Sequence, residues 1–185
     1  MAKYLNNHMN NREFNKAKGL TLIELITVLS ILAISISLAV PSFKSLMQRN
    51  QASSEAQKML SSLFLARSEA VKRGVRMTMC ARSLPRTNPE TCTGATEWSK
   101  GWLLFIDESG VIGDFDATDV LLKAWDSVSG NPTLTGTSSI VQFQTSGDVL
   151  ASVGFVLTPP NCSGQQVRNI DVSVTGRAAI SKSSC

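Results

Sequence analysis

Histidine is nearly missing from this chain of 185 residues, because the only one is His8. The sequence also lacks a CxxC pair and a glycine-rich phosphate loop. These absences argue against a zinc site and against most hydrolase or nucleotide chemistry. Carboxylates are present, but nothing in the sequence positions a catalytic pair. We therefore predict that the chain is not an enzyme and holds no cofactor or metal.

Aromatic residues are also scarce, at 6% of the chain. The three tryptophans are more typical of core or hairpin packing than of a ligand platform. They are Trp98, Trp102 and Trp125.

Charge is almost absent from residues 20–40, where Glu24 is the only charged side chain. A helix of this length spans roughly 30 Å, the thickness of the hydrocarbon core of a bilayer. A lone acidic group there costs about 2.5–3.5 kcal/mol on insertion scales, which marks Glu24 as a functional candidate.

The start of this apolar run reads Lys18-Gly19-Leu20-Thr21-Leu22-Ile23-Glu24-Leu25. It resembles the G-F-T-L-I-E-L signature of type IV prepilins and type II secretion pseudopilins, with leucine in place of the usual phenylalanine. The resemblance implies that prepilin peptidase cuts between Gly19 and Leu20 and methylates the new N-terminus at Leu20. Pro41 matches a proline that the family also has. A secretory signal cut after Ser37-Leu38-Ala39, or a plain membrane anchor, are the alternatives.

The same resemblance implies a role in assembly for Glu24. In the bilayer its carboxylate lacks water and needs a positive or hydrogen-bonding partner. In the family, that partner is the free amine of the first residue of a neighbouring subunit, the counterpart of Leu20. We therefore expect other pilin or pseudopilin subunits as partners through this helix.

Four segments follow from this pattern: a cleaved leader (1–19), a transmembrane or fibre-core helix (20–40), an amphipathic helix (41–74) and a β-rich head (75–185). The leader contributes +3 of the formal net charge of +4, so the remainder carries +1. Basic residues before a span keep that end in the cytoplasm. We therefore predict a single-pass protein of the bacterial inner membrane with a periplasmic head, which later enters a fibre.

The four cysteines suit an oxidising compartment and predict two disulfides. They are Cys80, Cys92, Cys162 and Cys185. Three connectivities are possible, and proximity along the chain favours Cys80–Cys92 with Cys162–Cys185. Each bond would contribute roughly 3 kcal/mol in the chain-entropy model.

Apolar residues between 43 and 70 recur at spacings of three and four, which indicates one face of a helix that the rest of the chain should cover. They are Phe43, Leu46, Met47, Ala56, Met59, Leu60, Leu63, Ala66 and Ala70. Gly74 is a plausible C-terminal stop, and Pro41 predicts a kink or local melting.

Strands are expected at 75–80, 102–106, 120–125, 140–144, 153–157, 167–174 and 178–181. The fold class is therefore α+β and pilin-like, with a long N-terminal helix packed on an antiparallel sheet.

Later motifs resemble the GspH/FimT branch of the family. They include the helical stretch 67–73, Gly101-Trp102-Leu103-Leu104-Phe105-Ile106-Asp107, Cys162, Arg168-Asn169-Ile170 and Gly176-Arg177. This branch implies a minor subunit, GspH-like in secretion pseudopili or FimT- or FimU-like in type IV pili.

FimT-like proteins also suggest an alternative function, DNA binding for natural transformation. Their branch carries Gly-Arg-x-Arg near the C-terminus, whereas this chain has Gly176-Arg177-Ala178-Ala179 and lacks the second arginine. Arg168, Arg177 and Lys182 could still meet phosphates, giving weak, salt-sensitive binding. Without a DNA-binding role, these cations would belong to a solvated surface or provide charge complementarity between subunits.

An acidic cluster leaves one further possibility, a Ca²⁺ loop, although the EF-hand pattern is not met. Its members are Asp107, Glu108, Asp114, Asp116 and Asp119.

Overall fold

The computed structural model describes residues 19–83, 90–108 and 113–185, without the side chains of residues 41 and 42. The predicted leader before Gly19, including His8, lies outside this range. The chain divides into two units, Met1–Pro41 and Ser42–Cys185, each described by itself. We call the second unit the head.

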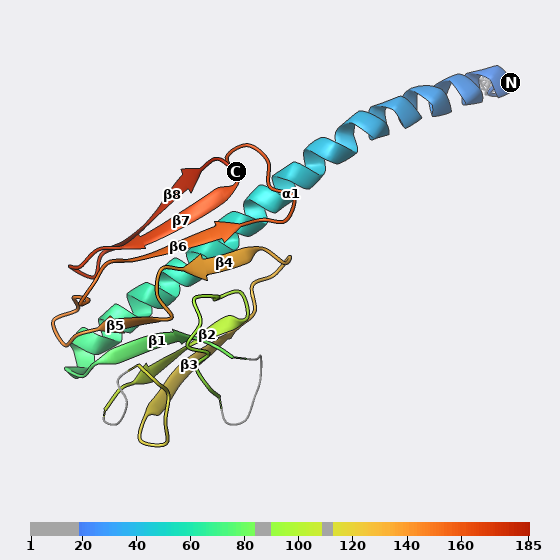
Figure 1. Ribbon diagram of the computed structural model, residues 1–185. Helices are drawn as coiled ribbons and strands as arrows, with labels where there is room; N and C mark the ends of the chain where they lie inside the picture. The colour runs from blue at the N-terminus through green and yellow to red at the C-terminus, as the bar shows by residue number, and fades with distance from the viewer. Residues whose placement is uncertain (1–18, 84–89, 109–112) are drawn as a thin grey trace, which may run out of the picture. The chain divides into compact units, whose positions relative to one another are not determined.

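One long helix, α1 (Leu22–Arg73), runs through both units (Figure 1). It is helical through position 41, so the local melting expected at Pro41 is not seen, and the kink stays a prediction. The helix ends as predicted at Gly74, whose φ of +67° suits a residue without Cβ. The Gly74 N–H donates to the Ala70 carbonyl at 2.9 Å.

The C-terminal part of α1 buries a narrow, small-residue face. Its buried apolar residues are Ala52, Ala56, Met59, Leu63, Ala66 and Ala70. The alternating spacing of four and three keeps them on one side of the helix, and the alanines let the sheets approach closely. This confirms the predicted face from Ala56 onward.

The prediction was wrong for Phe43, Leu46 and Met47, whose side chains are 63%, 52% and 53% exposed. A helix turns about 100° per residue. Phe43 therefore lies about 180° from Ala52, on the side away from the sheets. The apolar residues spaced by three and four therefore form two stripes on α1. The head covers the one from Ala52 to Ala70 and leaves the one with Phe43 exposed.

The first sheet has the strand order β3-β2-β1-β5, and all its neighbours are antiparallel. Its strands are β1 (Met77–Ala81), β2 (Gly101–Ile106), β3 (Val120–Asp126) and β5 (Ile140–Phe143). Every residue of β2 is buried because both faces are covered. One face enters the main core, and on the other Leu103 and Phe105 form a smaller cluster with Cys80. A continuous apolar run is the expected signature of such a strand.

The second sheet has the order β4-β6-β7-β8 and is also antiparallel. Its strands are β4 (Thr133–Gly136), β6 (Val153–Thr158), β7 (Val167–Val172) and β8 (Ala178–Ser183). In β6 the residues alternate between the core and the outer face, so that Val153, Phe155 and Leu157 point inward.

The expected single sheet is therefore two sheets, and one strand was missed. Strand β4 has only four residues, Thr-Leu-Thr-Gly, and a single buried side chain, Leu134. Its periodicity is too short to identify a strand. Pairing with β6 defines it, and an isolated bridge between Glu97 and Thr135 supports it.

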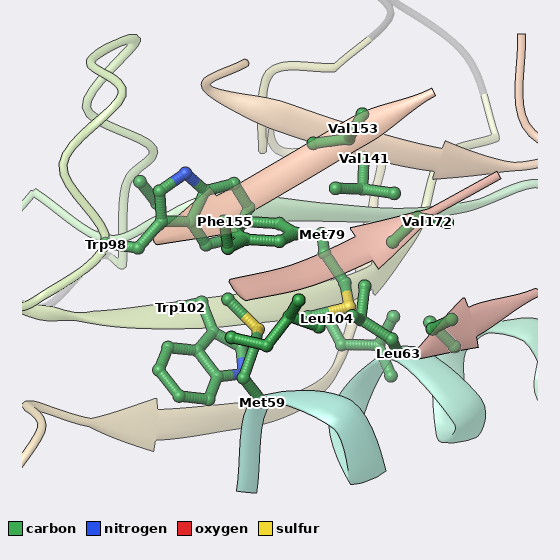
Figure 2. Close-up of a cluster of buried hydrophobic side chains, with 14 of the residues drawn as sticks. Met59, Leu63, Met79, Trp98, Trp102, Leu104, Val141, Val153, Phe155 and Val172 are labelled. Carbon is green, nitrogen blue, oxygen red and sulfur yellow. The ribbon is translucent and has the colours of Figure 1, made fainter. Parts of the chain in front are cut away.

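The main core lies where α1 and both sheets meet (Figure 2). Met59 and Leu63 come from α1, Met79 and Leu104 from the first sheet, and Phe155 from the second. Trp98 packs edge-on against Phe155 with ring centroids 5.0 Å apart.

The tryptophans have the packing roles that their sequence positions predicted. Trp98 donates its Nε1–H to the Ser138 carbonyl at 3.0 Å. Trp102 and Trp125 face each other across β2 and β3 as a stacked pair, with centroids 5.9 Å apart.

Candidate functional site

The predicted cleavage position lies just before α1. Gly19 and Leu20 are exposed and outside regular structure, and the helix begins at Leu22. A peptidase needs accessible backbone outside regular structure, which this peptide bond provides. The geometry is therefore compatible with cleavage between Gly19 and Leu20.

Thr21 caps the helix, a role that the sequence interpretation missed. Its Oγ1 accepts the Glu24 backbone N–H at 3.3 Å, and its carbonyl accepts the Leu25 N–H at 3.1 Å. The pattern Thr21-x-x-Glu24 before an apolar run is the sequence sign of such a cap. A carboxylate in the first turn also interacts favourably with the helix dipole. Glu24 thus also stabilises the start of α1. A test of its predicted assembly role must distinguish the two roles.

The apolar segment behind Glu24 is uncovered. Its large apolar side chains, from Leu20 to Val40, are all among the exposed ones. The helix is long and apolar enough to cross a membrane, with a mean hydropathy of 2.4 in its most apolar window. Polar side chains in the segment are tied to the helix backbone, as when Ser30 Oγ donates to the Ile26 carbonyl at 2.8 Å. The surface offered to lipid or to another helix is therefore apolar.

Both disulfides connect the cysteines that proximity favoured, Cys80–Cys92 and Cys162–Cys185. The first closes the segment after β1, and the second ties the C-terminus to the β6–β7 loop. The Cys185 N–H also donates to the Gly164 carbonyl at 3.0 Å.

The three predicted phosphate-contacting cations are not presented together. Arg168 does lie opposite Lys182 in the β7–β8 pairing, as suggested. Its side chain, however, is only 4% exposed and donates to Ser53 Oγ at 3.1 and 3.3 Å. It also donates to the carbonyls of Gln165 and Val167. Arg168 is therefore a structural residue that ties β7 to α1, and its assignment to DNA is corrected.

Arg177 and Lys182 are exposed, but they lie near opposite ends of β8. Five residues of strand separate them by about 17 Å. Two cations at this spacing make a much weaker anion site than the three that were expected.

Gly176, the glycine of the shortened Gly-Arg motif, has a structural explanation. Its φ is +72°, and a Cβ there would lie 1.9 Å from the Gly147 carbonyl oxygen. Arg67 Nε donates to that same carbonyl at 3.0 Å, and its second nitrogen donates to the Thr175 carbonyl at 3.0 Å. The β7–β8 turn is thus fastened to α1.

The acidic cluster divides into separately used carboxylates. Asp107 is buried and accepts from Thr78 Oγ1 and Gln142 Nε2, both at 2.8 Å, and from the Gly113 N–H at 3.1 Å. Asp119 accepts the backbone N–H groups of Asp116 and Glu108, while partial burial raises the pKa of its carboxyl. Within residues 19–83, 90–108 and 113–185, no three acidic, histidine or cysteine side chains gather as metal ligands.

Sequence reasoning also missed a buried ion pair. Arg82 is 2% exposed; two of its nitrogens donate to the Glu90 carboxylate, one at 2.6 Å, and a third donates to Asp126 Oδ1 at 3.1 Å. Arg82 follows an apolar strand directly, and only the pairing with β2 and the Cys92 bridge shows that it is enclosed. It ties Glu90, two residues before Cys92 of the first disulfide, to the end of β1.

A membrane-length apolar helix, continuing along two antiparallel sheets, is the architecture of the pilin-like proteins. Two crystal structures of the type IV minor pilin FimU of Pseudomonas aeruginosa have a similar fold. They are 20% identical in sequence, with TM-scores of 0.56 and 0.52. They cover 72% and 70% of this chain, and 90% and 91% of the FimU chains are covered. A comparison with curated proteins finds no match.

Two sequence families match the chain. Residues 14–40 match the prokaryotic N-terminal methylation motif, and residues 55–176 match the type II transport protein GspH. The second match spans most of the chain, so the protein belongs to the GspH family. Proteins of this pilin and pseudopilin class are structural, and the chain is not an enzyme. The methylation motif implies processing by prepilin peptidase, and the apolar helix is consistent with anchoring in the inner membrane before assembly.

Proposed function

We propose that this protein is a minor pilin or pseudopilin subunit of a type IV pilus or type II secretion pseudopilus. Prepilin peptidase cuts between Gly19 and Leu20 and methylates Leu20. The subunit is held in the inner membrane with its head in the periplasm. It then joins other pilin or pseudopilin subunits in a fibre. The observation that carries this proposal is the uncovered apolar segment at the position of the methylation motif.

That segment is unstable in water by itself. Burying one large aliphatic side chain is worth about 1.5–3 kcal/mol, and this segment exposes more than ten of them. Lipid covers them before assembly, and the helices of neighbouring subunits cover them in the fibre. The transfer exchanges one apolar environment for another, so little apolar surface meets water during assembly.

Glu24 supplies the specific interaction in that transfer. In lipid its carboxylate is poorly solvated, and the amine of a neighbouring subunit's first residue offers it an opposite charge. The pair would also set the register between neighbouring helices. Pro41 ends this assembly segment and belongs to the same proposal.

Replacing Glu24 tests the proposal and separates its two roles. We expect Glu24→Ala and Glu24→Gln both to abolish incorporation into sheared fibres, while membrane insertion and cleavage persist. Glutamine keeps a polar side chain near the cap but has no charge to pair with the amine. The control is Thr21→Ala, which removes the cap and leaves the charge.

Immunoblots of the fibre and membrane fractions give the readout. Normal recovery of both Glu24 variants in fibres would contradict the assembly role. If only Glu24→Ala fails, a polar side chain suffices and the charge pairing is wrong.

The DNA-binding alternative now depends on Arg177 and Lys182 alone, because Arg168 is enclosed. Their separation along β8 favours the structural subunit.

A further inference from the structure

One end of the head combines exposed apolar side chains with positive charge. We call it the neck surface. It comprises residues 43–50 of α1 and the loops 127–132 and 158–164. Phe43, Leu46 and Met47 expose more than half of their side chains here. The loop 158–164 borders this helical segment, because Gln48 donates to the Pro160 carbonyl at 3.1 Å. The loop 127–132 lies beside Gln51, because a Cβ built on Gly130 would be 2.3 Å from the Gln51 amide nitrogen. Gln51 and Gly130 line a pocket of about 150 Å³ between them.

The charge on the neck surface is of one sign. Lys44 and Arg49 are its only charged residues, and residues 41–54 contain no acid. The two loops contain no charged residue. A Cβ built on Gly164 would lie 4.0 Å from a guanidinium nitrogen of Arg49, which places that cation beside the second loop. By contrast, the segment 91–160 as a whole holds eight acidic side chains and two basic ones, none of them in the two loops.

The position of the neck surface along the chain indicates what covers it. It follows directly after the apolar segment that ends at Val40. At 1.5 Å per residue, Phe43 lies about 5 Å and Arg49 about 14 Å of helix beyond Val40. The headgroup region is roughly 5–8 Å deep on each side of the hydrocarbon core. Phe43 and Lys44 of an upright helix would therefore reach headgroup depth. Met47 and Arg49 would lie beyond that region, where the long Arg49 side chain can still extend back to a phosphate.

This composition matches a surface that lies on anionic lipid. The Phe43 ring can enter the boundary between headgroups and acyl chains, while Lys44 and Arg49 pair with phosphates. The loops can approach without repulsion because they contribute no acid. We propose that, before assembly, the neck surface docks the head onto the anionic periplasmic face of the inner membrane. The inference rests on the proposed membrane-held precursor but not on fibre formation.

Lipid quenching of an introduced tryptophan tests this docking. Ser163→Trp places a probe in the exposed part of the loop 158–164, and Leu150→Trp is the matched control elsewhere on the head, where the native side chain is 78% exposed. Each variant of the full-length precursor is placed in nanodiscs that contain lipids brominated near the headgroup. The discs hold phosphatidylcholine alone or with phosphatidylglycerol. The parent protein supplies the background from the native tryptophans.

We expect quenching of Ser163→Trp in the anionic discs and little in the zwitterionic discs. Adding Lys44→Gln and Arg49→Gln should lower the ratio of docked to undocked heads roughly five-fold per cation. The matched pair Lys72→Gln and Arg177→Gln removes the same charge from exposed positions in the last turn of α1 and before β8, and should leave quenching unchanged.

Three results would overturn the docking: equal quenching in both lipid mixtures, equal effects of the two double variants, or equal quenching of Leu150→Trp. Fibre incorporation of the Lys44/Arg49 variant is measured separately. Lost incorporation with unchanged quenching would assign the neck surface to a neighbouring subunit and overturn the lipid assignment. A chain that docks but is never cleaved or incorporated would instead contradict the proposed function.

Discussion

Residues 20–40 and the head differ in the exposure of their apolar side chains. In the first region, the large apolar side chains are exposed, and no described part of the chain covers them. In the head, apolar side chains of α1 and of two sheets cover each other, and Trp98, Phe155 and Leu134 are fully buried. The described head therefore contains its own stabilising contacts, whereas the proposed function gives the apolar segment lipid or other subunits as its cover.

The boundary between the two regimes lies within one helix. Ala66 and Ala70 pack in the core with both sheets, and Arg67 donates to the Gly147 carbonyl in a turn. Phe43, Leu46 and Met47 are exposed. The helix α1 is thus continuous from a segment that the described chain leaves uncovered to one that packs in the head. The side chains on the surface of a helix determine what packs against it, because its backbone groups are already hydrogen-bonded within the helix.

The largest expected contrast comes from one apolar deletion in each region. Phe155→Ala should lower the free energy of unfolding of the head by about 3–5 kcal/mol, because it leaves a cavity in the core. Leu32→Ala, in the uncovered segment, should leave that free energy unchanged. Denaturant unfolding of the full chain in detergent, followed by tryptophan fluorescence, measures both, since all tryptophans lie in the head. A comparable loss from Leu32→Ala would show that the two regions are coupled.

A smaller contrast compares two glycines in the head. Gly176→Ala brings a Cβ against the Gly147 carbonyl and forces a left-handed φ, so the turn must move. We expect a loss of at least about 2 kcal/mol. Gly94 has a similar φ of +66° but open space around it, and Gly94→Ala should cost about 1 kcal/mol. The same unfolding assay applies. Equal losses would mean that the close approach adds nothing to the cost of the φ angle.

Two arginines of β7 and its hairpin sharpen the distinction between interior and surface. Arg168→Ala removes hydrogen bonds to Ser53 and to two carbonyls, and should cost about 2 kcal/mol. Arg177→Ala should stay within about 0.5 kcal/mol. Gel shifts with duplex DNA at low salt complete the test. Binding that Arg177→Ala abolishes would revive the DNA alternative.

The smallest effect concerns pH. Arg73 Nε lies 2.5 Å from the Glu69 carboxylate, and this hydrogen bond lowers the pKa of Glu69 from its usual 4.5. Because the pKa is lower in the folded state, the pair stabilises the head above about pH 4.5, and that contribution is lost as the pH falls through the folded-state value. Glu69→Gln should therefore slightly flatten the acid dependence of stability, with Glu108→Gln as the exposed control. Identical pH profiles for wild type and Glu69→Gln would contradict a role for this pair.

The local and repetitive features could be predicted from the sequence. The apolar run predicted the long uncovered helical segment, and seven of the eight strands in the described residues appeared as apolar runs or alternations. Gly74 ended α1 as expected, because a left-handed cap depends on one residue type. The cysteines paired with their nearest partners along the chain, a contact of short sequence separation.

Contacts between distant segments were decided by the tertiary structure. Whether strands form one sheet or two depends on backbone pairing between segments far apart, which a pattern of period two does not encode. The burial of Arg168 likewise depends on Ser53, 115 residues away, and the enclosure of Arg82 depends on Glu90 and Asp126. A charged residue looks the same in a sequence whether water or a carboxylate surrounds it. The sequence alone therefore predicted the long apolar helix, and only the fold showed which cations and which face of that helix the head buries.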